Sequence, residues 1–370
     1  MRVKFNLQVP KDIIKIKDIF VSNGYKLFVV GGAVRDSLLK KSIKDWDLAT
    51  DAKPDIVENM MKTAGLRTLG TGKSFGVINV FTDSDEYEIA TFRSDLGSDG
   101  RRPNSVEFTN IDTDVMRRDL TINALFYDIE TGEVVDLVGG IDDLKNRVVR
   151  TVGSANDRFG EDRLRILRAI RFAGRFNSDL DADAEKSLAN DASLEGISSE
   201  RIRDEFLKGI KTAKSIKYFL GLLNQYNLLD WIFKDIQNVD TDFQEERDPT
   251  VLLAYMLRNN DPKQLNGKLN KLTYSINEIR GIVFLVNLTM LNVNNVYELK
   301  KMQNNSGVND EQIRKFSNLV GLNTELFESF IKFELSIGGA EVQKLGIEAG
   351  PEMGRMIKKL ELQNFLKYLN

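Results

Sequence analysis

The sequence of 370 residues contains no cysteine and no histidine, and only 6 of its residues are proline. Without cysteine, the chain has no disulfides, no thiolate metal ligands and no cysteine nucleophile. Without histidine, it has no imidazole general base and no Ser-His-Asp triad, and most types of zinc site are excluded. Any chemistry must therefore use carboxylates, lysine, arginine, hydroxyl groups, backbone amides and a hard metal ion.

Charge and hydropathy set further limits. The 52 basic and 55 acidic residues leave a net charge of −3, which by itself gives no sign of a nucleic-acid partner. Apolar runs such as residues 282–286 are too short to span a bilayer, and residues 11–20 (KDIIKIKDIF) are too charged for the core of a signal peptide. We therefore expect a cytosolic protein without a membrane partner. Its length predicts two or more domains.

The pattern of apolar residues changes near residue 150. Short β-like runs bounded by Gly, Asp or Asn come before it, at residues 27–30, 47–50, 77–81, 87–92, 106–108 and 134–137. Helical spacing comes after it, at residues 161–176, 199–210, 215–233, 250–258, 278–290, 312–322, 324–335 and 351–369, with a polar linker at 303–310. These patterns predict an α+β protein in which a mixed sheet with helices is followed by an all-helical remainder.

Asp45 and Asp47 are separated by a single residue at the start of a predicted strand. Residues i and i+2 of a strand point to the same face, so both carboxylates could bind one hard cation. Adjacent carboxylates repel each other unless a positive charge lies between them, which favours a metal ion. Two solvated acids at the entrance of a strand are the alternative.

Glu88 is the candidate for a third acid. Two metal ions about 4 Å apart would promote an in-line phosphoryl transfer, and holding both requires a further carboxylate. Glu86 and Glu88 share one face of the β-like run, and Glu88 lies further inside it. An exposed strand face without a catalytic role is the alternative.

Gly31 and Gly32 stand between the predicted strand 27–30 and a predicted helix at 33–39. Glycines let the backbone approach a phosphate closely, and a helix N-terminus offers free N–H groups and the positive end of its dipole. Arg35 could add a bidentate phosphate contact. The spacing is not that of a dinucleotide-binding G-x-G-x-x-G motif, and a plain turn is the alternative.

Arg118 and Asp119 lie in residues 117–124 (RRDLTINA). Arginine can bind phosphate, and Asp119 and Asn123 can accept hydrogen bonds from ribose hydroxyls. A structural ion pair is the alternative. Basic residues then crowd residues 145–175, so the local field suits a polyanion even though the net charge is −3.

Asp162, Arg165, Arg168 and Arg171 step by three residues along a predicted helix. Neighbours at i and i+3 touch on a helix, so Asp162 could accept from, and Arg165 donate to, the edge of one base. A three-residue step drifts by about 60° each time at roughly 3.6 residues per turn. Asp162 and Arg171 therefore lie on opposite sides unless the helix deviates. A salt-bridged, partly solvated helix is the alternative.

In this combination the segments resemble the class II tRNA nucleotidyltransferases, the CCA-adding enzymes, and their poly(A) polymerase relatives. The matching motifs follow the order of that family: GGAVRD at 31–36, DWD at 45–47, RRDLTINA at 117–124, DLVGGIDDL at 136–144, EDRLR at 161–165 and ISSERI at 197–202. They cover roughly residues 27–207. Most of the later helical region carries no motif that we can match.

The resemblance implies a seahorse-shaped protein. A nucleotidyltransferase head would span residues 1–140, a helical neck that recognises the base 141–210, a helical body 211–302, and a helical tail that binds tRNA 303–370. It also implies that CTP and ATP are used to add C, C and A to the 3′ end of tRNA without a nucleic-acid template, releasing pyrophosphate. Asp45 and Asp47 would bind Mg²⁺ in a two-metal transfer, with Glu88 as the further catalytic carboxylate.

The resemblance further implies which residues bind the nucleotide: Gly31, Gly32 and Arg35 at the triphosphate, Arg118 and Asp119 near the sugar, and Asp162, Arg165, Arg168 and Arg171 on the helical side. In the family, the pair that matches Asp162 and Arg165 acts as a protein template for the edge of C or A. The drift along the helix suits Arg168 and Arg171 better to triphosphate or RNA contacts than to base reading.

Two segments bear on which nucleotides are added. Residues 94–104 resemble the flexible loop that complete CCA-adding enzymes need for the switch from C to A, which favours complete CCA addition. Phe75 stands where many of these enzymes have histidine, which leaves open an enzyme that adds only C or only A. The same motifs would also suit a poly(A) polymerase, or a non-catalytic relative that binds RNA or senses nucleotides.

Overall fold

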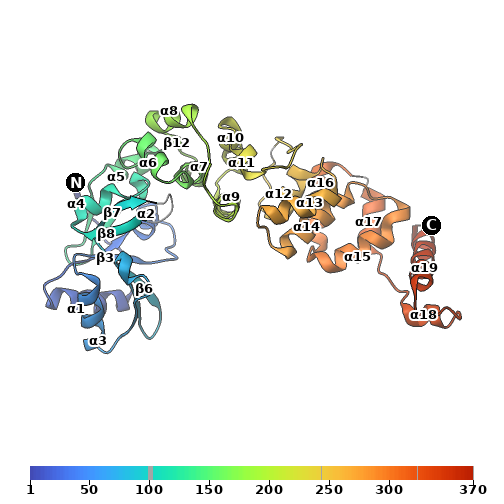
Figure 1. Cartoon of the computed structure of the whole chain (residues 1–370), viewed down its shortest axis with the longest axis horizontal. Helices are drawn as coiled ribbons and strands as arrows, with labels where there is room; N and C mark the ends of the chain where they lie inside the picture. Colours follow the sequence, from blue (N-terminus) through green and yellow to red (C-terminus); the bar gives the residue numbers. More distant parts are fainter. Residues whose placement is uncertain (99–102, 243, 323, 370) are drawn as a thin grey trace. The chain divides into compact units, whose positions relative to one another are not determined.

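The chain divides into two compact units, Met1–Ile197 and Ser198–Asn370. The computed structural model describes residues 1–98, 103–242, 244–322 and 324–369. The first unit holds a mixed sheet with helices, and the described part of the second unit is helical (Figure 1). The predicted fold class is therefore confirmed, whereas the head, neck, body and tail boundaries stay predictions. No helix in the described ranges is long and apolar enough to cross a membrane.

The main sheet of the first unit has eight strands. Their spatial order is β1 (Arg2–Lys4), β10 (Glu133–Asp136), β9 (Leu125–Asp128), β2 (Leu27–Val30), β3 (Asp47–Thr50), β6 (Glu86–Thr91), β5 (Val77–Phe81) and β4 (Arg67–Leu69). Only β3 and β6 run parallel within it. Two small sheets pair β7 (Arg93–Ser98) with β8 (Pro103–Phe108), and β11 (Val148–Val149) with β12 (Asp179–Leu180).

Strand β2 is buried on both faces of this sheet. Its residues Leu-Phe-Val-Val alternate between two apolar clusters, with Val29 in the cluster that includes α1 (Lys11–Ser22) and Phe28 in the other. The ring of Phe28 lies 5.6 Å from that of Phe92 and 6.4 Å from that of Phe126. Because β2 is packed on both sides, it fixes the position of the turn that follows it.

The helices of the first unit include one correction to the sequence prediction. Besides α1 they are α2 (Gly32–Leu38), α3 (Pro54–Thr63), η1 (Lys73–Phe75), α4 (Ile111–Met116), η2 (Thr121–Asn123), α5 (Gly140–Asn146), α6 (Ala155–Glu161), α7 (Leu164–Phe176) and α8 (Ala182–Asn190). The single helix predicted over 161–176 is broken, because Asp162 is extended with φ −150° and ψ 104°. Its Oδ1 accepts a hydrogen bond from the N–H of Leu164 at 3.0 Å, which starts α7 in a new direction.

The second unit is built from helices with short connections. They are α9 (Ser199–Thr212), α10 (Ile216–Gln225), α11 (Leu228–Ile232), α12 (Pro249–Leu257), α13 (Pro262–Lys271), α14 (Ile276–Leu288), η3 (Val293–Asn295), α15 (Val296–Ser306), α16 (Asp310–Val320), α17 (Thr324–Lys332), α18 (Gly339–Gln343) and α19 (Pro351–Leu369). The helix predicted over 215–233 is split at Asn227, which has φ 54°. Most of the linker predicted over 303–310 is helical, since α15 continues to Ser306.

Candidate active site

Residues from the glycine turn, the carboxylate pair and both arginine segments line one pocket of about 570 Å³ in the first unit. All the predicted site residues line this pocket except Glu88 and Arg171, and because most of them are predicted to bind a nucleotide we refer to it as the nucleotide pocket. Arg117 and Asn123 of the RRDLTINA segment line it as well, and so does Phe172, which we did not predict. The fold therefore gathers motifs from distant parts of the chain around one cavity.

Asp45 and Asp47 lie side by side at the wall of the nucleotide pocket, and both are exposed. β3 begins at Asp47, so Asp45 lies in the connection before the strand and the expectation that both carboxylates share one strand face does not apply. Partial desolvation in the pocket raises the pKa of Asp47, the charge of Asp45 raises it further, and Arg118 opposes both. A divalent cation would remove this repulsion, so the pair fits a metal ion.

Glu88 lies directly opposite Asp47 in the parallel pair of β3 and β6. Partial burial raises the pKa of Glu88, and the charge of Asp47 raises it further. Among the residues that the structure describes, no group of three or more acidic side chains is placed to hold a metal ion. Asp45 and Asp47 are therefore the candidate ligands, and a role for Glu88 beside them stays a prediction.

The turn after β2 depends on glycine. Gly31 has φ +67°, a conformation that residues with a side chain rarely adopt. Its N–H donates to the carbonyl oxygen of Leu125 at 2.9 Å, and a Cβ at this position would lie 3.5 Å from the carbonyl oxygen of Asn123. Gly32 then begins α2. The backbone at this wall of the pocket is thus free of side chains, as close approach of a phosphate requires.

Arg35 is almost completely buried and is held by several partners. Its Nε donates to Asp36 at 2.9 Å, its Nη1 donates to the side-chain oxygen of Asn123, and its guanidinium lies over the rings of Phe172 and Phe176 at 5.0 and 5.4 Å. Burial lowers the pKa of Arg35, and the charge and hydrogen bond of Asp36 oppose this. Asn123 belongs to the RRDLTINA segment, and its place beside Arg35 agrees with the expectation that this segment lies at the site.

A second pocket of about 410 Å³ shares the carboxylate pair and part of the glycine turn. Lys41, Lys44 and Arg175 add positive charge to its lining. The carboxylates can bind a metal ion, and the cationic side chains beside them can bind the phosphates that contact this ion.

Arg118 and Asp119 each have a charged partner. Nη2 of Arg118 lies 2.9 Å from Oδ2 of Asp114, and the guanidinium lies 4.6 Å from the ring centre of Phe126. Asp119 accepts a hydrogen bond from Nε of Arg168 at 2.7 Å. Burial would raise the pKa of Asp119, but the charge and hydrogen bond of Arg168 outweigh it, so the pKa is lowered. The RRD segment is thus fixed to α4 on one side and α7 on the other.

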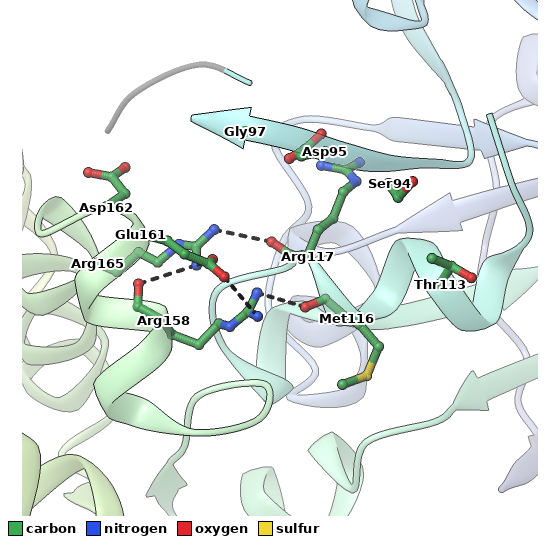
Figure 2. Close-up of a pocket in the computed structure, with 10 residues that line it drawn as sticks. All are labelled: Ser94, Asp95, Gly97, Thr113, Met116, Arg117, Arg158, Glu161, Asp162 and Arg165. Atoms are coloured by element: carbon green, nitrogen blue, oxygen red, sulfur yellow. Dashed lines mark hydrogen bonds and ion pairs between the residues drawn. The ribbon is translucent and has the colours of Figure 1, made fainter. Parts of the chain in front are cut away.

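Asp162 and Arg165 line both the nucleotide pocket and a third pocket of about 440 Å³, which Figure 2 shows between β7 and the α6–α7 segment. Arg165 donates through Nη1 to Glu161 at 2.6 Å and to the carbonyl oxygen of Arg158 at 3.3 Å. Its Nη2 donates to the carbonyl oxygen of Arg117 at 3.2 Å. Arg165 is therefore anchored to the protein at the edge of the pocket.

Arg168 and Arg171 are placed differently. Arg168 lines the nucleotide pocket and pairs with Asp119. Arg171 is buried, and its guanidinium lies 4.3 Å from the ring centre of Phe172. Within the described residues Arg171 does not line the nucleotide pocket. Its predicted role as a nucleotide contact stays a prediction.

The two segments that bear on nucleotide choice meet at Arg93. In the predicted flexible loop, the described residues belong to the antiparallel strands β7 and β8, and residues 99–102 lie outside the described residues. Phe75 lies in η1, and its carbonyl oxygen accepts a hydrogen bond from Nη1 of Arg93. This contact uses the backbone of Phe75, so a histidine at the same position could make it too.

Comparison with known families gives the class of the protein. The family described as "Poly A polymerase head domain" matches residues 27–150. The family described as "Probable RNA and SrmB- binding site of polymerase A" matches residues 182–239. The match to the head domain lies within the first unit and contains the carboxylate pair, the glycine turn and the RRDLTINA segment, so the chain is a nucleotidyltransferase of this polymerase class.

Full-length relatives narrow the class to a family. The CCA-adding enzyme of Lactobacillus delbrueckii subsp. bulgaricus is 34% identical over 359 residues, which cover 91% of this chain and 88% of that protein. The Leuconostoc mesenteroides CCA-adding enzyme is 32% identical over 388 residues, covering 96% and 92%. The crystal structure of the Bacillus stearothermophilus CCA-adding enzyme in complex with CTP matches with a TM-score of 0.75 at 25% identity, covering 95% and 91%.

The chain belongs to the CCA-adding enzyme family. This confirms the resemblance that we drew from the order of the motifs. It also confirms the predicted fold class, because the structural match spans both units. Membership in this nucleotidyltransferase family implies the use of a divalent metal ion.

Proposed function

We propose that this protein adds C, C and A to the 3′ end of tRNA, using CTP and ATP and releasing pyrophosphate. The observation that carries the proposal is the nucleotide pocket, in which the Asp45–Asp47 pair, the glycine turn and the Asp162–Arg165 pair line one cavity. Transfer of a nucleotide needs a metal site, a triphosphate site and a means of choosing the base. One cavity of this chain provides groups for all three.

Asp45 and Asp47 would hold the divalent ion, which we propose to be Mg²⁺ because hard carboxylate oxygens suit it. When bound, such an ion would activate the 3′-hydroxyl and stabilise the charge on the phosphates and on the leaving pyrophosphate. Glu88, opposite Asp47, would act beside this pair as a further catalytic carboxylate. No imidazole is required, which agrees with a chain that has no histidine.

The remaining pocket residues would bind and orient the nucleotide. Gly31 and Gly32 would present the backbone to the triphosphate, with Arg35 behind them. Arg118 and Asp119 would lie near the sugar. Arg168 and Arg171 would contribute positive charge to the triphosphate or the RNA, Arg168 directly from the pocket wall.

Base choice would follow from the hydrogen-bonding pattern that C and A share. Each presents an amino group next to a ring nitrogen acceptor, whereas U and G present an oxygen acceptor next to a ring N–H. A carboxylate at Asp162 can accept from the amino group while Arg165 donates to the ring nitrogen. The same pair meets U and G with acceptor facing acceptor and donor facing donor, which rejects them.

The helical part would serve the RNA. We propose that residues 141–210 recognise the base together with the head, residues 211–302 form a helical body and residues 303–370 bind tRNA. We propose that the protein acts in the cytoplasm, where tRNA, CTP and ATP are present together.

The test is to incubate the protein with tRNA lacking its terminal nucleotides, Mg²⁺, and CTP, ATP or both, and to sequence the products. We expect CCA from the mixture. Addition of C alone or A alone would mean a partial enzyme, and a long A tract would mean a poly(A) polymerase. Binding of tRNA without incorporation would mean a non-catalytic relative.

The carboxylate pair gives the corresponding mutational prediction. Asp45→Ala and Asp47→Ala should each lower incorporation at least about a thousandfold, because metal-held charge stabilisation is worth several kcal/mol and 1.36 kcal/mol is tenfold in rate. Asp55→Ala removes an acid of the same unit that pairs with Lys73, and it should keep the wild-type rate. Wild-type rates in both pair variants would refute the proposed function.

A further inference from the structure

Arg158 and Arg165 donate to two successive backbone carbonyls at the end of α4 (Figure 2). Nη1 of Arg158 lies 2.9 Å from the carbonyl oxygen of Met116, and Nη2 of Arg165 lies 3.2 Å from that of Arg117. The two guanidinium groups also share the carboxylate of Glu161, Arg158 through Oε1 at 2.9 Å and Arg165 through Oε2 at 2.6 Å. The five groups form a closed network between α4, α6 and the first turn of α7.

This network decides which donors of Arg165 remain for a ligand. A guanidinium has five N–H donors. The two on Nη1 have Glu161 and the carbonyl oxygen of Arg158 as acceptors, and one on Nη2 has the carbonyl oxygen of Arg117. Within the described residues, the Nε–H and the second Nη2–H are the donors of Arg165 that have no acceptor. The three bonded donors hold the guanidinium in one orientation, and in that orientation the remaining donors can bind a single acceptor on a base.

Within this network, Arg158 connects Glu161 to the backbone at the end of α4. Its side chain is only 18% exposed, whereas that of Glu161 is 43% exposed. An exposed carboxylate that pairs with one arginine at i+4 is weakly held, since such pairs are worth about 0.3–0.5 kcal/mol. The second guanidinium, fixed by the carbonyl of Met116, restricts the rotation of Glu161. Glu161 in turn holds Arg165.

We propose that Arg158 is a positioning residue that sets the choice between C and U, and between A and G, by holding Glu161 and through it Arg165. This inference rests on the proposed function. Arg158 also links base choice to the rest of the site, because Met116 and Arg117 directly precede Arg118 and Asp119. Removal of Arg158 frees Glu161 to turn, so Arg165 can swing and offer its donors to other acceptors, including the oxygen of a wrong base.

The experiment compares Arg158→Gln, Arg158→Lys and a matched control with wild type. The control is Arg150→Gln, because Arg150 also bridges two acceptors in the first unit, Asp143 and Asp181, and lines none of the three pockets described above. kcat/KM is measured for CTP and for UTP on tRNA that lacks CCA. Dissociation constants of both nucleotides are measured without tRNA, and tryptophan fluorescence checks that each variant is folded.

We expect Arg158→Gln to lower the CTP/UTP ratio of kcat/KM about tenfold, as loss of a charge-assisted hydrogen bond would. The KM for CTP should rise, and the CTP/UTP ratio of affinities should fall with it. Arg158→Lys keeps the charge beside Glu161 and should restore part of the ratio, while Arg150→Gln should keep the wild-type ratio.

An unchanged CTP/UTP ratio in Arg158→Gln, or an equal loss for both nucleotides, would overturn the positioning role. If Arg150→Gln lowers the CTP/UTP ratio by the same factor, the positioning role is overturned too, because general destabilisation of the first unit would then explain the lower ratio. If wild type incorporates no nucleotide, the proposed function fails. The ratio of dissociation constants needs no turnover and still decides the role of Arg158.

Discussion

Two buried charged side chains of the first unit and two of the second unit have different kinds of partner. In the first unit, the buried Arg35 and Asp114 hold groups that line the nucleotide pocket. In the second unit, the buried Lys300 and Glu361 bind the backbone of neighbouring segments. A buried charge is costly unless it is paired, so its partner shows what it stabilises. Arg35 and Asp114 thus fix side chains of the pocket, whereas Lys300 and Glu361 fasten one segment of the second unit to another.

The chain offers a separate probe for each unit. Trp46 lies in the first unit and Trp231 in the second, and no other tryptophan is present. Single replacements by phenylalanine therefore leave fluorescence from one unit at a time. Perturbations of buried charge can thus be assigned to the unit in which they act.

The largest effect should come from Asp114 in the first unit. It is 1% exposed, and it accepts from the guanidinium groups of Arg117 and Arg118 at 2.9 Å and from the backbone N–H of Arg93 at 3.2 Å. Asp114→Ala leaves these donors without their acceptor and should lower the free energy of unfolding by about 3–5 kcal/mol. Urea unfolding of a variant that keeps only Trp46 measures the loss. A change below about 1 kcal/mol would show that Asp114 is not the support of this network.

Glu361 in the second unit should give a smaller and local effect. Its Oε1 accepts from the N–H groups of Ser336 and Ile337, and its side chain is 1% exposed. Glu361→Ala should cost about 1–3 kcal/mol, the usual penalty for an unsatisfied buried group. Hydrogen exchange of these two amides should become about tenfold faster or more. The CTP/UTP ratio should stay at its wild-type value, and a lower ratio would contradict the division of roles between the units.

The smallest effect should be a gain in stability. The pKa of Asp47 is raised in the folded state, so the folded protein binds its proton more tightly than the unfolded chain does, and ionisation of Asp47 opposes folding. Without a divalent ion, Asp47→Asn should therefore raise Tm by about 1–2 °C at neutral pH. The gain should shrink as the pH falls through the raised pKa of Asp47 and vanish below about pH 4.

Melting curves in the presence of a chelator at several pH values measure this gain. Asp55→Asn is the matched control, because it removes the carboxylate that lies 2.7 Å from Nζ of Lys73 and should not raise Tm. Added Mg²⁺ should stabilise wild type more than Asp47→Asn. Equal stabilisation of both proteins would argue against Asp47 as a metal ligand.

Much of the secondary structure could be predicted from local patterns. Strands 27–30, 47–50 and 77–81 and the helix at 351–369 were predicted with the bounds that the structure has. The break at Asp162 could not, because the apolar spacing continues across it. Long-range contacts help to hold the segment: Arg163 donates to Asp191 at 2.8 Å and to the carbonyl oxygen of Ser193 at 3.1 Å. Such contacts leave no periodic signal in the sequence.

The residues of the candidate site also divide into those that the sequence predicted and those that it did not. The motifs named nearly all the residues that line the nucleotide pocket, because their types and spacings suit phosphate, sugar and base. They did not name Asp114, which holds Arg118. The spacing of Asp114 from Arg117 and Arg118, at i+3 and i+4 on a helix, was a signal that could have found it.

The sequence by itself determined the chemistry that is open to this protein: carboxylates and arginines without histidine or cysteine, arranged in the motif order of one family. Only the tertiary structure decided which arginines line the nucleotide pocket. Arg168 lines the pocket and pairs with Asp119, whereas Arg171, one step of three further along α7, is buried against Phe172. The physical reason is that helix periodicity separates these side chains, but the partners that fix them, such as Asp119 for Arg168, come from distant parts of the chain and leave no signal in the local spacing.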